Sequence, residues 1–125
     1  MREGPIDLDL PCDTRMVRIA RLVSSGVATV AGFDVEEVED LRIAVDELCT
    51  TLLEGGQGER IHLRFSLQEG EVALEGSVPA PGSVVLEPER LTLSRQILAV
   101  VADDHTVELV DGELRVTLRK HRASG

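Results

Sequence analysis

Hydrophobic positions near the N-terminus change from a period of two to a period of three to four. Residues 6–10 alternate between apolar and acidic side chains, which predicts a short strand with one buried face. Pro11 ends this strand, and Asp13 or Thr14 can cap the helix that follows. That helix is expected to run to Gly32, a residue that suits a helix C-terminus. Its predicted buried positions are Met16, Ile19, Ala20, Val23, Val27 and Val30.

The sequence predicts a second helix more strongly, between Asp34 and the glycines of residues 55–58. Asp34 and Glu37 form a D-x-x-E capping box at its start. The three glycines within residues 55–58 stop it, because glycine is a poor helix former. Between these limits the apolar residues follow steps of three and four, which places them on one face of the helix. The predicted buried seam comprises Val38, Leu41, Val45, Leu48 and Leu52.

The second half of the chain predicts two hairpins and a third helix. Residues 60–68 alternate apolar and polar side chains, and Glu69-Gly70 is a turn signal before a returning strand that contains Val72, Leu74 and Gly76. Residues 79–82 are expected to be a loop, because two prolines remove donors that a strand needs. A third helix should begin at Pro88 and run to about Asp103. Its predicted core stripe is Leu91, Ser94, Ile97, Leu98 and Val101, and the closing hairpin is 106–110 with 114–118 around Asp111-Gly112.

The order of these elements, β-α-α-β-β-α-β-β, predicts an α+β fold made of two layers. About three helices are expected on one face of a mixed sheet of about five strands. The opposite face carries polar residues such as His62, Arg64 and Ser66, which favours solvent or a polar interface there. The chain has no repeat and no linker-like segment, so residues 1–125 are expected to form one domain.

Charge and composition exclude several classes of function. The formal net charge of −10 argues against nucleic acid as a partner, because phosphate binding needs a basic surface. No apolar run approaches the ~20 residues that cross a bilayer, and no signal peptide precedes the first strand, so no membrane role is expected. Cys12 and Cys49 fit neither a disulfide framework nor a zinc site, which favours the cytoplasm. The excess of arginine over lysine favours a bacterial origin.

Candidate chemistry lies on the second helix. Glu47 and Thr51 are four residues apart and therefore lie on the same side of the helix. A helix carboxylate can act as a general base, and a threonine hydroxyl can bind magnesium. The simpler alternative is that Glu47 is a solvated helix residue and that Thr51 has no functional role.

The surrounding residues resemble a known family. Leu10-Pro11, Val17-Arg18, Gly32-Phe33-Asp34 and above all residues 40–49 are similar to the anti-sigma regulatory factors, the serine kinases of the GHKL (histidine kinase-like) ATPase superfamily. The resemblance implies the histidine kinase-like ATPase sandwich, ATP and magnesium as cofactors, and a sigma factor or an anti-sigma antagonist as protein partner. It also implies that Glu47 is the catalytic base, and family members are often homodimers.

Four positions and one loop depart from the family pattern. The family has a magnesium-binding asparagine where this chain has Thr51, and an adenine-binding aspartate where it has Gly76. Val78 and Ala80 stand where the family has glycines, and the glycine-rich phosphate loop is missing. Backbone amides cradle phosphates only where the chain can approach closely. We therefore expect a degenerate site, with no cofactor. If the site is active, Glu47, Thr51 and Gly76 would contact ATP, and Thr51 would bind magnesium.

Three functions remain open from the sequence. The first is a regulatory module that binds a sigma factor or an anti-sigma antagonist without nucleotide chemistry. The second is an active ATP-dependent serine/threonine kinase that phosphorylates such an antagonist. The third is a self-associating adaptor domain.

Overall fold

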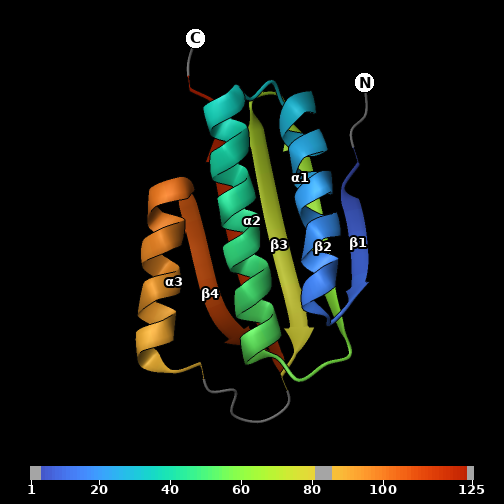
Figure 1. Ribbon diagram of the computed structural model, residues 1–125, viewed down its shortest axis with the longest axis vertical. Helices are drawn as coiled ribbons and strands as arrows, with labels where there is room; N and C mark the ends of the chain where they lie inside the picture. The colour runs from blue at the N-terminus through green and yellow to red at the C-terminus, as the bar shows by residue number, and fades with distance from the viewer. Residues whose placement is uncertain (1–3, 81–85, 124–125) are drawn as a thin grey trace.

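The computed structural model describes residues 4–80 and 86–123. Five strands and three α-helices follow one another in the predicted order (Figure 1). The elements are β1 (Ile6–Pro11), a 3-10 turn (Thr14–Met16), α1 (Val17–Val30), α2 (Val35–Gly55), β2 (Arg60–Gln68), β3 (Glu71–Pro79), α3 (Pro88–Val101), β4 (Asp104–Val110) and β5 (Glu113–His121).

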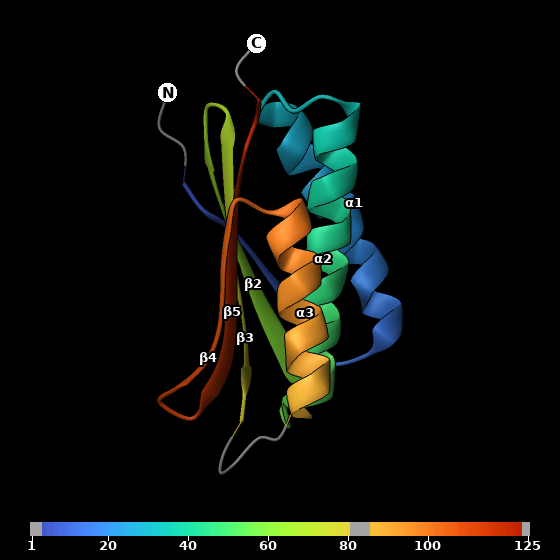
Figure 2. The same cartoon turned by 90° about the vertical axis from the view of Figure 1, so that its left-hand side faces the viewer.

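The strands form a single sheet in the order β1-β2-β3-β5-β4. The helices lie together on one of its faces, as Figure 2 shows, so the predicted α+β sandwich is confirmed. The expectation of a mixed sheet was wrong, because every strand pair in the described residues is antiparallel. The reason lies in the connection through α3. This helix returns the chain to the outer side of β5, where β4 then pairs with β5 as a tight hairpin.

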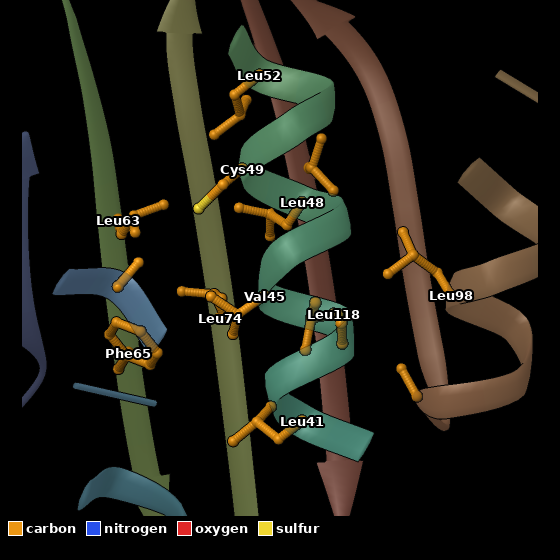
Figure 3. Packing of buried hydrophobic residues seen from close by; sticks show 14 of the residues in the cluster. Leu41, Val45, Leu48, Cys49, Leu52, Leu63, Phe65, Leu74, Leu98 and Leu118 are labelled. Carbon is orange, nitrogen blue, oxygen red and sulfur yellow. The ribbon is translucent and has the colours of Figure 1, made fainter. Parts of the chain in front are cut away.

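Helix α2 lies over the centre of the sheet and contributes more buried hydrophobic residues than any other element of the described chain. Four of its five predicted seam residues are fully buried, and Val38 packs against the core at its edge. Figure 3 shows this seam facing leucines and a phenylalanine of the sheet. The labelled core residues are Leu41, Val45, Leu48, Cys49, Leu52, Leu63, Phe65, Leu74, Leu98 and Leu118.

Helix α1 buries most of its predicted face. Ala20 and Val27 are buried as predicted, together with Val17, Ser24 and Ala28, and Met16 and Val23 pack against the core. The prediction was wrong for Val30 and Ile19, which are 75% and 40% exposed. Helix α1 lies at one side of the helical layer, with α2 as its only helical neighbour among the described residues (Figure 1). Apolar residues on its other side therefore stay in solvent.

Two boundaries also differ from the prediction. Strand β3 extends through Pro79, which pairs with Glu113, so the predicted loop was wrong at this residue. Ala80 lies just outside the strand, and positions 81–82 lie outside the described residues. Helix α3 begins at Pro88 as expected but ends at Val101. The predicted Asp111-Gly112 turn is confirmed, since both residues have positive φ angles of 51° and 77°.

None of the helices in the described part of the chain is both long enough and apolar enough to cross a membrane.

Candidate functional site

A capping box fixes the start of α2, and with it the side of the helix on which Glu47 and Thr51 lie. The side chain of Asp34 accepts a hydrogen bond from the backbone N–H of Glu37 at 2.8 Å, and Glu37 accepts one from the backbone N–H of Asp34 at 2.8 Å. This reciprocal capping box sets the first turn of the helix. Three turns later Glu47 and Thr51 lie on one side, and the Thr51 hydroxyl is 3.3 Å from Glu47 Oε2. The structure thus brings the two predicted residues together.

Helix α3 covers this pair with two polar side chains. Arg90 donates from Nη2 to Glu47 Oε2 at 2.9 Å and from Nε to Glu54 Oε2 at 2.8 Å. One turn later the Ser94 hydroxyl lies 2.9 Å from the Thr51 hydroxyl. Arg90 and Ser94 are four residues apart on α3, so they meet the α2 pair from one face of their own helix. We refer to Glu47, Thr51, Arg90 and Ser94 as the α2–α3 cluster.

The α2–α3 cluster is largely shielded from solvent. Thr51 and Ser94 are each 1% exposed, and the side chain of Glu47 is 11% exposed. The two hydroxyls satisfy each other in only one arrangement that also serves the carboxylate. In that arrangement Ser94 donates to Thr51, and Thr51 donates to Glu47. Glu47 Oε2 then accepts from Thr51 and from Arg90. The polar groups of α2 at this point are therefore bonded to protein atoms.

Two opposing effects act on Arg90. Partial burial lowers the pKa of its guanidinium, whereas hydrogen bonds and charge from Glu47 and then Glu54 raise it, and the net shift is upward. The group therefore stays cationic at every pH at which the protein is folded. Its Nη1 is buried and has no hydrogen-bond partner among the described residues. Arg90 therefore supplies a constant positive charge beside Glu47 and Glu54.

Gly76 lies on β3 beneath α2. A Cβ atom at this position would come within 2.6 Å of Leu48 and 2.8 Å of Leu52, two side chains of the α2 seam. The nearest atom of Leu63 would be at 3.1 Å. Contacts this short require the neighbours to move, so a larger side chain at residue 76 has no space toward the helices. Val78 and Ala80, each 1% exposed, continue the buried row beyond it.

Sequence reasoning found Glu47, Thr51 and Gly76 but missed the role of Arg90. Ser94 was predicted to face the core, and it does, but its hydroxyl was not recognised as the partner of Thr51. A serine on the apolar stripe of a helix predicts a buried hydrogen bond, because a buried hydroxyl requires a partner. Within the described residues, no group of three or more acidic, cysteine or histidine side chains is arranged to hold a metal ion.

Clefts flank α2 and α3 without reaching the α2–α3 cluster. One of about 170 Å³ lies between α3 and the β4–β5 hairpin, and is lined by apolar residues that include Leu86 and Leu91. Another of about 230 Å³ lies between α1 and α2, next to Asp46 and Thr50. Neither of these two clefts is lined by any member of the cluster or by Gly76.

Comparison with known proteins identifies relatives over part of the chain, although no family profile matches it. Serine-protein kinase RsbW of Bacillus pumilus is 37% identical over 75 residues, which cover 55% of this chain and 46% of that protein. RsbW of Bacillus subtilis is 37% identical over 68 residues, covering 51% of this chain and 42% of that protein. Over about half of its length the chain is similar to these serine-protein kinases. It spans less than half the length of these relatives.

The fold agrees with this relationship. A crystal structure of the RsbU and RsbW domains of a Mycobacterium tuberculosis protein superposes with a TM-score of 0.74. The superposition covers 94% of this chain and 32% of the other, at 15% sequence identity. At that identity the match supports the histidine kinase-like fold and says nothing of activity. The predicted resemblance to the anti-sigma regulatory kinases is confirmed by the sequence comparison.

Proposed function

We propose that this chain is a single anti-sigma factor-like regulatory domain, spanning residues 1–125, that binds a protein partner without using ATP. The partner is a sigma factor or an anti-sigma antagonist of the bacterial cytoplasm. The observation that carries the proposal is the α2–α3 cluster. In it, the residues that would serve ATP and magnesium are bonded to Arg90 and Ser94.

The chemistry of the donor set supports this interpretation. A magnesium ion needs oxygen ligands at about 2.0–2.1 Å, usually together with several waters. The Thr51 hydroxyl is almost fully buried and lies 2.9 Å from Ser94, so a metal could reach it only if α3 moved away. The carboxylate of Glu47 faces a guanidinium, which competes with any cation for the same oxygen.

The packing of α2 on strand β3 supports the same conclusion. The family aspartate that binds adenine corresponds to Gly76, where leucines of α2 occupy the space that any side chain would need. An adenine ring cannot be held where the helix packs directly on the strand. ATP and magnesium therefore do not fit the residues as they are arranged, and we derive no catalytic step through them.

A binding experiment tests the proposal. The purified protein is titrated calorimetrically with the sigma factors and the anti-sigma antagonists encoded by the same genome, with and without ATP and magnesium. We expect a complex with one of them whose affinity does not change when nucleotide is added. Direct binding of ATP at micromolar or lower Kd, abolished by Glu47→Ala, would contradict it.

The active kinase is the second candidate, and the retention of Glu47 favours it. If α3 moved away in solution, Glu47 would be free to act as a base on the serine hydroxyl of an antagonist. The test uses labelled ATP with magnesium or manganese and each co-encoded antagonist. Phosphate transfer that Glu47→Gln abolishes would establish the kinase, whereas absence of transfer to all of them would exclude it. Homodimer formation, which the resemblance also implies, stays a prediction.

A further inference from the structure

Strand β4 forms one edge of the sheet and lies beside helix α3. Within the described residues β4 pairs with β5 alone, so its other side faces away from the sheet (Figure 1). Between β4 and α3 lies a cleft of about 170 Å³, which we call the α3–β4 cleft. Its lining residues are Leu86, Leu91, Val107, Glu108, Leu109 and Leu114. Leu109 is 51% exposed, so this edge presents apolar surface next to unpaired backbone.

The turn between β4 and β5 determines which backbone groups of β4 point outward. Residues 111–112 form a two-residue turn with positive φ angles, so Val110 and Glu113 are its closing pair. The closing pair of such a turn exchanges hydrogen bonds, and pairs that do so alternate with pairs that do not. The residues whose N–H and C=O groups then point away from β5 are His105, Val107 and Leu109. An edge of this kind is a template for a further strand.

Arg95 of α3 contacts one of these outward groups. Its Nη2 donates to the carbonyl oxygen of Val107 at 3.2 Å, which agrees with an outward direction of that carbonyl. The N–H of an added strand would compete with the guanidinium for the same oxygen. Because Arg95 is an exposed residue, its side chain can be displaced into solvent. Arg95 therefore lowers the affinity of the edge for a strand without blocking it.

The two faces of β4 define the side chains that an added strand would carry. Successive residues of a strand point to opposite faces, so Leu109 lies on the side of the cleft and Glu108 on the open face. Arg115, the residue opposite Glu108, instead bonds Glu113 at 3.4 Å and lies 3.7 Å from Glu75. Glu108 thus has no ion pair within the described residues. An apolar side chain suits the cleft, and a lysine or arginine suits the position beside Glu108.

Neither the other edge of the sheet nor a second copy of the chain offers an equivalent fit. Strand β1 ends at Pro11, which has no N–H, and its Asp7 and Asp9 are already paired with arginines. A second copy would bring its own acidic β4 to the edge, with Glu108 and the exposed Asp111 on both sides. Charge complementarity therefore favours a basic segment of a different protein.

We propose that β4 is a docking edge for an extended segment, alternately apolar and basic, of the regulatory protein partner. The segment adds to the sheet beside β4 and places one side chain in the α3–β4 cleft. An engineered cavity of about 150 Å³ holds benzene, so this cleft accommodates a leucine-sized group. Backbone hydrogen bonds supply affinity, whereas the cleft and Glu108 select the side chains. The inference rests on the proposed function in that the segment belongs to the protein partner.

Amide hydrogen exchange, followed by NMR, tests whether the edge is free and whether a strand adds to it. In the free chain the N–H groups of Val107 and Leu109 should exchange at least tenfold faster than those of Thr106 and Glu108, which face β5. The probe is the synthetic peptide KVKLKVK, capped at both ends. Its addition should slow exchange at Val107 and Leu109 at least fivefold. Protection of both groups in the free chain, or no change with saturating peptide, overturns the proposal.

Peptide variants separate strand addition from attraction between opposite charges. The peptide KKVLVKK has the same composition and charge but lacks the alternation, and it should bind at least tenfold more weakly in calorimetry. N-methylation of one alternate set of residues in KVKLKVK should abolish binding, and N-methylation of the other set should have little effect. Equal affinities of the two peptides, or equal effects of the two methylation patterns, would mean that charge alone attracts the peptide and would reject the docking edge.

Substitutions in the protein locate the site. Glu108→Lys and Leu109→Ser should each weaken binding of KVKLKVK at least fivefold with an unchanged circular dichroism spectrum. Glu36→Lys, in the first turn of α2, is the matched charge control and should have little effect. Arg95→Ala should tighten binding about threefold, because it frees the carbonyl of Val107 and removes a like charge. Weaker binding in Arg95→Ala, or losses equal to that of Glu36→Lys, would place the peptide elsewhere.

The docking edge and the proposed function fail in different ways. If a sigma factor or antagonist binds the wild-type chain and Glu108→Lys equally well, the regulatory function stands and β4 is rejected as its surface. If no such protein binds but KVKLKVK does, with the dependence on Glu108 and Leu109 given above, the edge is a docking site and the regulatory partner is rejected. If neither binds, both proposals are rejected.

Discussion

Arg90 of α3 bridges two carboxylates of α2, Glu47 and Glu54, and is the residue whose replacement is most informative. Its side chain is only 24% exposed and that of Glu47 only 11%, so the pair is shielded from water more than an ordinary surface ion pair. Removing one partner leaves the other charge poorly solvated, which costs more than the pair itself contributes. The two partners must therefore be tested together.

We expect Arg90→Met to lower the free energy of unfolding by about 1–3 kcal/mol, because it leaves the Glu47 carboxylate without its cation. Glu47→Gln in addition should recover part of this loss, giving a coupling energy of about 1 kcal/mol or more in a double-mutant cycle. Urea unfolding provides the measurement. Arg42→Met, which removes an exposed pair with Glu39, is the control and should cost less than about 0.5 kcal/mol. Additive effects of the two cluster substitutions would contradict the contact.

Replacement by alanine is expected to have opposite effects on stability at Gly76 and at Gly26. Gly76→Ala places a Cβ atom within 2.6 Å of Leu48, so it should destabilise the protein by about 1–3 kcal/mol. Gly26→Ala meets no atom within 4 Å and should stabilise the isolated chain by about 0.5–1 kcal/mol. Thermal unfolding of the two variants and of the wild-type chain compares them. A neutral Gly76→Ala would show that the space under α2 is open after all.

At the scale of elements, Asp13 caps the 3-10 turn (Thr14–Met16) that leads into α1. Its carboxylate accepts hydrogen bonds from the side chain of Arg15 and from the Arg15 backbone N–H, and these bonds lower its pKa to about 2 from an ordinary 3.8. A lowered folded-state pKa means that the interaction stabilises the fold fully above about pH 3.8. That contribution is lost as the pH falls through about 2.

Carbon-13 NMR titration of the Asp13 carboxylate checks this assignment. We expect a midpoint near pH 2 in the wild-type chain and a midpoint shifted toward 3.8 in Arg15→Ala, where only the backbone donor remains. Arg42→Ala, remote from the 3-10 turn, should leave the titration of Asp13 unchanged. If the midpoint is the same with and without Arg15, the side-chain bond seen in the structure does not persist in solution.

Elements were more predictable from the sequence than the contacts between them. The capping box, the α2 seam and the Asp111-Gly112 turn were found because each depends on residues within a few positions of one another. The exposure of Ile19 and Val30 on α1 was not found, since it depends on which neighbours the helix has in three dimensions. Arg90 was missed for the same reason. It lies 43 residues from Glu47 in the chain, and only the return of α3 onto α2 brings the two together.

At the scale of the whole molecule, we propose that α3 packs on α2 where the family resemblance places a nucleotide, and so closes that site. The family resemblance places a nucleotide beside α2, whereas in this chain Arg90 and Ser94 supply the polar contacts and leucines fill the sheet side. A closed site of this kind should not respond to nucleotide. A ligand that binds the folded state alone raises its stability by RT ln(1 + [L]/Kd), about 2.7 kcal/mol at one hundred times Kd.

Thermal unfolding with and without millimolar ATP and magnesium measures this response in the intact chain. An intact site with a Kd of some tens of micromolar would raise the midpoint by several degrees for a domain of this size. We expect a change below about 1 °C. RsbW of Bacillus subtilis, assayed in parallel, controls for the nucleotide and metal preparation. A shift of several degrees that Glu47→Ala removes would mean that α3 opens readily, and the protein would then have to be considered a kinase.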